Sequence, residues 1–160
     1  MAYEFNEQVD EILRKAKIYA EMDQDVYIRP SHIFFTILKE QDNLIIFTLE
    51  SMNVDVEILM EAVSKIRNKN ILLLSGETQT QYSKECKDVF NKSVEIDSPI
   101  NLTSLMLAIL ILETELTKTF SDNIVDYDVF EDNIMELKDI YRDQEDLVDD
   151  AFKIVTTSTD

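Results

Sequence analysis

The sequence predicts an all-α protein, in which two pseudo-symmetric four-helix repeats form one eight-helix domain and a C-terminal amphipathic helix follows. The 160 residues include one glycine and two prolines, too few for the tight turns that a sheet needs. Apolar residues recur at helical spacing along much of the chain. A nearly uncharged stretch occurs at 28–38 and again at 100–110, and helices this apolar are buried over most of their circumference.

The first repeat is expected at about residues 3–67. Pro30 suits the first position of a helix, where its missing N–H costs nothing. Asp55 is a good N-cap for the last helix of the repeat, and Val54 can pack against Leu59 as a hydrophobic staple. A polar loop is expected at 22–27, and the four helices are expected at about residues 5–20, 30–38, 44–52 and 56–66.

The second repeat is expected at about residues 82–137, with Ser83 as the N-cap of its first helix. The pair Val125-Asp126 repeats the pair Val54-Asp55 of the first repeat. We call each pair a restart, because a new helix is expected to begin directly after it. Matched segments in the same order indicate an internal repeat. The inner face of the first helix in this repeat is expected to consist of Cys86, Val89, Phe90, Ser93 and Val94.

Two segments lie outside this pattern. The middle segment, 68–81, holds the only glycine, and its apolar residues 71–74 need cover from a short extended piece or a turn of helix. Residues 1–137 are thus expected to form the double-repeat domain, and 138–160 an acidic C-terminal helix and linker. An apolar stripe continues from Ile134 to Val155. We favour its folding back on the domain; the alternative is a stripe that stays open for a partner helix.

The charge restricts the partners. The net charge is −18, and residues 122–160 hold 13 acidic against 3 basic residues. Such a chain repels nucleic acid and anionic membranes, so we expect neither as a partner. We interpret the charge mainly as a solubility feature, with a preference for basic protein segments as the sharper alternative. A lone cysteine and the lack of a signal peptide favour a cytoplasmic protein.

The sequence contains no constellation typical of an enzyme. One glycine cannot form a phosphate-binding P-loop, and no Cys/His cluster has metal-ligand spacing. We therefore expect no catalysis, no cofactor and no metal in this chain. His32 is the only histidine, and a hydrogen-bonded structural role is favoured over a ligand or a base. Cys86 lies on an apolar face and is interpreted as inert core.

The doubled pattern resembles the N-terminal domain of Clp-type unfoldases, the chaperone subunits of ATP-dependent proteases and disaggregases. The residues from Ser31 to Glu40, SHIFFTILKE, are similar to the family's Thr-Glu-His-Ile-Leu-Leu-x-Leu-x-x-Glu. The Val54-Asp55 restart is similar to the family's Gly-Val-Asp, and Tyr82-Ser83 opens the second repeat as an aromatic-Ser/Thr pair does in the family. The resemblance covers about residues 3–137.

The resemblance implies a double Clp-repeat domain that docks protein substrates or adaptor proteins and passes them to an ATPase ring absent from this chain. In one arrangement the chain is the first domain of such an unfoldase. In the alternative it is a stand-alone accessory or regulatory subunit that binds a Clp complex or another assembly.

A third reading, which does not depend on the resemblance, is an acidic mimic of nucleic acid. It requires acidic side chains in a row on the surface.

The resemblance also suggests docking residues, at the starts of the two apolar helices: Ser31, His32, Thr103 and Ser104. In some family members a glutamate before each repeat's histidine recognises phosphorylated arginine. Here Ser31 and Thr103 stand in its place, and Ser104 replaces the second histidine. Neutral hydroxyl groups cannot form the charge-assisted pair that a carboxylate makes with a guanidinium. We therefore expect phosphoarginine docking to be weak or lost.

Overall fold

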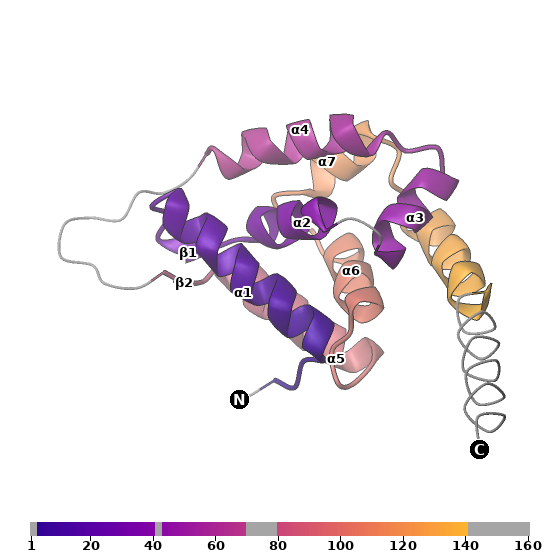
Figure 1. Ribbon diagram of the computed structural model, residues 1–160, viewed down its shortest axis with the longest axis horizontal. Helices are drawn as coiled ribbons and strands as arrows, with labels where there is room; N and C mark the ends of the chain where they lie inside the picture. The colour runs from indigo at the N-terminus through magenta and orange to yellow at the C-terminus, as the bar shows by residue number, and fades with distance from the viewer. Residues whose placement is uncertain (1–2, 41–42, 70–79, 141–160) are drawn as a thin grey trace, which may run out of the picture.

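Helices account for most of the computed structural model, which describes residues 3–40, 43–69 and 80–140 (Figure 1). The all-α prediction is confirmed. Besides the helices, the described residues form two strands of two residues each, β1 (Tyr27–Ile28) and β2 (Gln81–Tyr82), which pair in parallel. The helices are α1 (Glu7–Met22), α2 (Pro30–Lys39), α3 (Leu44–Ser51), α4 (Val56–Arg67), α5 (Lys84–Ile96), α6 (Leu102–Ile111), α7 (Thr117–Asp122) and residues 127–140.

The two repeats are related by pseudo-symmetry, and each completes the other. The N–H of Ser83, the N-cap of α5, donates to the carbonyl of Ile28 in the first repeat at 3.0 Å. In the same way, the N–H of Asn6, the N-cap of α1, donates to the carbonyl of Ile100 in the second repeat at 2.9 Å. The segment before the first helix of each repeat is therefore held by the segment before the second helix of the other.

The ends of α3 and α7 are also equivalent. Each helix ends in a Schellman motif, in which a residue with positive φ lies just after the helix: Asn53 at 62° and Ile124 at 58°. The N–H of the next residue then returns to a carbonyl in the last turn, Val54 to Leu49 at 3.0 Å and Val125 to Phe120 at 2.8 Å. The restart found twice in the sequence thus has one backbone geometry.

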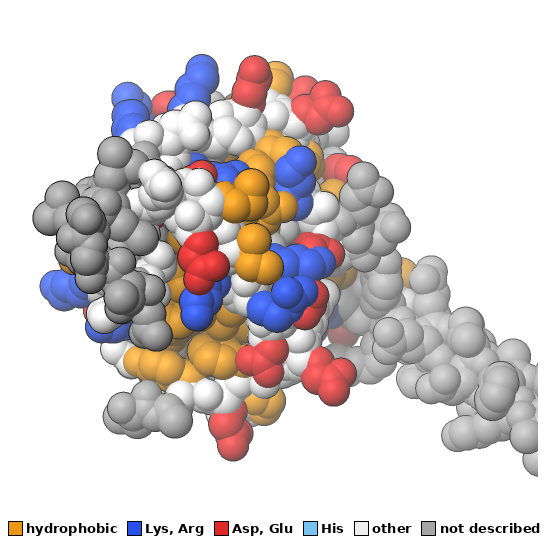
Figure 2. Space-filling model, turned by 60° about the vertical axis from the view of Figure 1, so that its left-hand side comes forward, with side chains coloured by type: hydrophobic (Ala, Val, Ile, Leu, Met, Phe, Trp, Pro, Cys, Tyr) orange, Lys and Arg blue, Asp and Glu red, His pale blue; other side chains and the backbone are white. Residues whose placement is uncertain are grey.

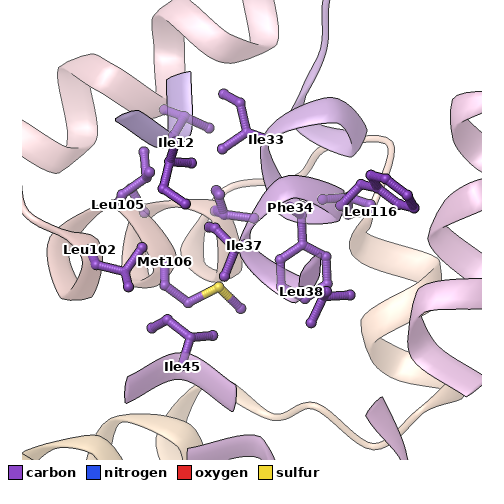
Figure 3. Packing of buried hydrophobic residues seen from close by; sticks show 14 of the residues in the cluster. Ile12, Ile33, Phe34, Ile37, Leu38, Ile45, Leu102, Leu105, Met106 and Leu116 are labelled. Carbon is purple, nitrogen blue, oxygen red and sulfur yellow. The ribbon is translucent and has the colours of Figure 1, made fainter. Parts of the chain in front are cut away.

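The two apolar helices, α2 and α6, meet in the centre of the core. Figure 3 shows Met106 of α6 between Ile37 of α2 and Ile45 of α3. All three side chains are fully buried. The hydrophobic core is thus shared by both repeats, as expected for two units that each carry one nearly uncharged helix.

Several local predictions are confirmed and two are wrong. Asp55 caps α4 and Ser83 caps α5 through their side chains. Val94, however, is 39% exposed, because it lies off the buried face that Cys86, Val89, Phe90 and Ser93 form on α5. Phe5 is not in a helix: α1 begins at Glu7, and Phe5 forms a parallel bridge with Ile100.

The helix at 127–140 lies beside α3, as Figure 1 shows, and the Ser51 hydroxyl donates to the Asn133 side chain at 3.2 Å. Phe130 and Ile134 are buried, whereas Ile140 is 45% exposed. The apolar stripe therefore packs on the domain at least as far as Ile134. Its continuation to Val155, and the middle residues 71–74, lie outside the described residues, so those predictions and the boundary at 137 remain untested.

Candidate functional site

The start of α2 is held by a contact between Arg29 and His32, the residues on either side of Pro30-Ser31. Arg29 is the N-cap, and its backbone N–H donates to Nδ1 of His32 at 3.0 Å. His32 thus does what the third residue of a capping box does, because its side chain satisfies the N–H of the N-cap residue. This contact defines the local role of the histidine before any role in binding.

His32 is completely buried. Because Nδ1 accepts a hydrogen bond, the proton of the neutral ring lies on Nε2, which is 3.1 Å from a carboxylate oxygen of Asp23. Burial lowers the pKa of His32 below its ordinary value by disfavouring the charged ring, and the nearby guanidinium of Arg29 lowers it further. The predicted structural role of His32 agrees with this environment.

Ser31 is buried as well, and its backbone is tied to the second repeat. Its N–H donates to the carboxylate of Glu115 at 2.8 Å, while its own hydroxyl oxygen has no hydrogen-bond partner in the part of the chain that the structure describes. Glu115 follows α6 in the sequence, and its second oxygen pairs with Arg29. A carboxylate of the chain itself therefore occupies the N-terminus of α2, where the helix dipole favours an anion.

Arg29 lies at the centre of a semi-buried polar network. Its guanidinium donates to Asp25 at 2.8 Å and to the Arg67 carbonyl at the C-terminal end of α4, also at 2.8 Å. Arg67 in turn forms two bonds with Asp23, at 2.6 and 2.9 Å. The network joins the end of α1, the start of α2 and the end of α4, and Glu115 connects it to the second repeat.

The corresponding residues of the second repeat form a simpler cap. Ser104 receives the N–H of Asn101 at 3.0 Å, and its own N–H donates to the Asn101 side chain at 2.9 Å. Ser104 thus fills at α6 the capping position that His32 fills at α2. Thr103 and Ser104 are both buried.

The structure does not bring the two predicted pairs of docking residues together. Ser31 is bonded to Glu115, which lies beyond the C-terminal end of α6, whereas Thr103 and Ser104 lie at the start of α6. A ten-residue helix is about 15 Å long, so the two pairs lie near opposite ends of α6. Since all four side chains are buried, a partner at either place has to contact their neighbours. A docking role for these residues stays a prediction.

Open pockets lie beside these buried groups. One, of about 370 Å³, borders the start of α2 and contains none of the four predicted residues; it is lined by Tyr27, Arg29, Ser83, Lys84, Glu85 and Glu115. A second, of about 430 Å³, lies between α4 and α7 and includes Ile58 and Lys118. A third, of about 410 Å³, lies where α7 leads into the helix at 127–140. Sequence reasoning missed all three pockets. The first two are formed by residues far apart in the chain. The third is formed by residues between 110 and 127, and it depends on how α6, α7 and the following helix pack together.

The described residues offer little reactive chemistry. Cys86 is fully buried, its thiol donates to the Ile28 carbonyl at 3.1 Å, and burial raises its pKa to about 12. A thiol held in its protonated form is a poor nucleophile and metal ligand. Among residues 3–40, 43–69 and 80–140, no group of His, Cys, Asp or Glu side chains is arranged to hold a metal ion.

The surface is mixed in character. Figure 2 shows basic and acidic side chains interspersed on one face, with hydrophobic side chains exposed between them. The nucleic-acid mimic required acidic side chains in a row, and the described residues of this face do not form one. None of the helices that the structure describes is long and apolar enough to cross a membrane.

Comparisons with known proteins agree with this architecture. The N-terminal domain of Hsp104 from Candida albicans has the same fold (TM-score 0.73, 16% identity, covering 84% of this chain and 91% of that chain). So do the N-domain of ClpV from Vibrio cholerae (TM-score 0.64, 15% identity, 75% and 77%) and the ClpV N-domain in a complex with VipB peptide (TM-score 0.62, 14% identity, 75% and 79%). No match was found among curated protein sequences.

The family comparison supplies the assignment. The family model described as the Clp repeat (R) N-terminal domain matches residues 4–122, which include both apolar helices and both first helices of the repeats. The hydrogen bonds of Asn6 and Ser83 to the other repeat, and the Schellman motif after α3, lie within the matched residues. The equivalent motif after α7 uses Ile124 and Val125, which lie just beyond them. The chain belongs to the Clp repeat N-terminal domain family.

Proposed function

We propose that this chain is a non-catalytic protein-binding domain that docks substrate or adaptor proteins for a Clp-type ATPase ring. The observation that carries the proposal is the family membership over residues 4–122, together with the shared fold of a ClpV N-domain solved in a complex with VipB peptide. At 14% identity that complex supports the fold; the binding of a protein segment is carried over here as a proposal.

The distribution of polar groups is consistent with binding rather than catalysis. The buried Asp25 and His32 and the partly buried Arg29 are hydrogen-bonded to one another or to the backbone. Their polar atoms therefore serve the structure of the domain. The solvent-facing features are pockets between helices, which suit the side chains of another protein. With a net charge of −18, we propose protein partners in the cytoplasm rather than nucleic acid or membrane.

The start of α2 supports the expected loss of phosphoarginine docking. A phosphate at that helix terminus has to displace Glu115, which bonds both Arg29 and the N–H of Ser31. The carboxylate is covalently part of the domain, so its effective concentration at the site is high. We therefore propose that this chain recognises its partners without a phosphoarginine mark.

A domain-swap experiment tests the proposed function. Residues 1–160 replace the N-domain of a Clp-type ATPase ring, and the ATP-dependent processing of fluorescein-labelled casein is measured. We expect faster processing than by the ring without an N-domain, and no gain when an unrelated helical domain of equal length is fused. Equal rates for all three rings would contradict the proposal.

The same assay separates the two arrangements of the chain. If the chain is an accessory subunit, the unfused protein added to the N-domain-less ring restores processing and co-sediments with the ring. If it acts as a covalent module, only the fusion does so.

A further inference from the structure

The pocket at the end of α7 combines an apolar floor with an exposed apolar side chain. Its volume is about 410 Å³, and its apolar lining comes from Leu110, Phe120, Ile124, Val125 and Tyr127. Phe120 and Val125 are almost fully buried, and the Phe120 ring stands edge-on to Phe34 in the core, with 5.2 Å between ring centroids. The floor of the pocket is therefore held in place by the core of the domain.

Ile124 projects at the edge of this pocket. It is 81% exposed, the largest exposed fraction among the large hydrophobic side chains of the described residues. Its φ of 58° places a β-branched residue in the left-handed region, which is unfavourable for such a residue because its Cβ substituents crowd the backbone. Isoleucine at this position therefore contributes nothing to the stability of the fold, because its side chain is exposed and its backbone is strained.

The first repeat provides an internal comparison. At the equivalent position it has Asn53, with φ of 62° and the same pair of return hydrogen bonds. Asparagine tolerates this conformation because its short polar side chain can bond locally. The backbone of this turn therefore does not require isoleucine, and the isoleucine at 124 needs another explanation. Observed strain of this kind is concentrated at functional sites.

The edge of the pocket is acidic. Asp126 lines the pocket, and Asp122 and Asp128 each directly follow a lining residue in the sequence. All three are exposed, and none has a basic side chain within ion-pair distance among the described residues. None of the described residues that line the pocket is a lysine or an arginine. The nearest basic residue in the sequence, Lys118, lines the neighbouring pocket toward α4, which Asp122 also borders. The charge at this edge therefore favours a cationic partner.

We infer that the pocket beside Ile124 docks a protein segment that presents an apolar side chain flanked by lysine or arginine. The apolar side chain enters the pocket and packs against Ile124 and Tyr127, while the flanking cations face Asp122, Asp126 and Asp128. This inference rests on the proposed protein-binding function and adds the site and the chemistry of the partner segment.

Peptide binding tests the inference directly. The probe is a fluorescein-labelled 15-residue peptide with leucine at helical spacing and lysine at the other positions; its counterpart has glutamate in place of lysine. Binding to the full chain is followed by fluorescence anisotropy. Ile124→Asn removes the side chain at no change in net charge, and installs the residue that the first repeat has there. Ile58→Asn is the matched control, because Ile58 is 55% exposed on α4 and lies at a different pocket.

We expect the lysine peptide to bind more tightly as salt is lowered, and Ile124→Asn to weaken it at least tenfold, while Ile58→Asn changes it less than twofold. Three results would overturn the inference: no binding, binding that Ile124→Asn leaves unchanged, or equal binding of the glutamate peptide. The inference would also be overturned if sedimentation showed that the wild-type chain is a dimer and the Ile124→Asn variant a monomer. A second copy of the chain would then occupy the pocket. If the peptide test fails but the fused ring still processes casein, with or without Ile124→Asn, the proposed function stands and only this docking site is refuted.

Discussion

Glu115 is the side chain whose removal should reveal most about how the repeats hold together. It reaches from the segment after α6 to the start of α2, where it pairs with Arg29 and accepts the N–H of Ser31. Glu115→Gln keeps the size and a hydrogen-bond acceptor but removes the charge. Glu115→Ala removes both contacts.

The expected cost follows from burial. The side chains of Arg29 and Glu115 are 11% and 18% exposed, so the pair lies between an exposed ion pair, worth up to about 1 kcal/mol, and a fully buried one, whose disruption costs about 3–5 kcal/mol. Arg29 keeps Asp25 and two backbone carbonyls as partners, which reduces the penalty. We expect Glu115→Gln to lower the free energy of unfolding by about 2 kcal/mol, and Glu115→Ala by about 3 kcal/mol, because it also loses the bond from Ser31.

Urea unfolding followed by circular dichroism at 222 nm measures both variants. Glu113→Gln is the matched control: Glu113 is exposed two residues away and has no hydrogen bond or ion pair among the described residues, so it should change stability by less than about 0.5 kcal/mol. For a chain of this size, about 2 kcal/mol corresponds to a decrease in Tm of roughly 4–8 °C. Equal stability of Glu115→Gln and Glu113→Gln would refute the reasoning, because the ion pair would then contribute nothing.

Three further predictions concern single sites. Ile124→Asn should raise the free energy of unfolding by about 1 kcal/mol in urea titrations, because it relieves an unfavourable φ; a decrease would show that Ile124 supports the fold. Because burial lowers the pKa of His32, the unfolded chain takes up a proton near pH 6.5 that the folded chain refuses. Stability should therefore fall as pH decreases below about 6.5, by at most about 1.4 kcal/mol per pH unit, and His32→Gln should flatten this dependence between pH 7.5 and 5.5. Calorimetric titration with free phosphoarginine should show no binding to the wild-type chain, and tight binding would contradict the role given to Glu115.

Much of the fold could be predicted because its determinants are local. The cap at Asp55 depends on N–H groups two and three residues away, and the cap at Ser83 on one three residues away. The uncharged stretches around α2 and α6 required burial, which the structure confirms. Helix periodicity did not place Val94 correctly, because a residue at the border of the apolar face can be either buried or exposed.

The environment of the candidate site could not be predicted in the same way. Arg29 and Glu115 are 86 residues apart, and no spacing rule relates them. The sequence marked the starts of α2 and α6 through resemblance, whereas the structure places those side chains in caps and in the core. The Asp25–Arg29 pair is local but gave no signal either, because residues 25–29 are not helical and the i,i+4 rule for ion pairs applies to helices.

The pseudo-symmetry helps to separate structural residues from functional ones. Where one backbone geometry occurs twice, a residue that differs between the repeats has to be explained by its own contacts. His32 passes this test, because it does the capping work of Ser104 and in addition reaches Asp23, which holds Arg67 of α4. Ile124 does not pass it: its side chain is largely solvent-exposed, and its backbone conformation is one that Asn53 adopts at lower cost. The first difference is accounted for by folding, and the second is left for a partner to explain.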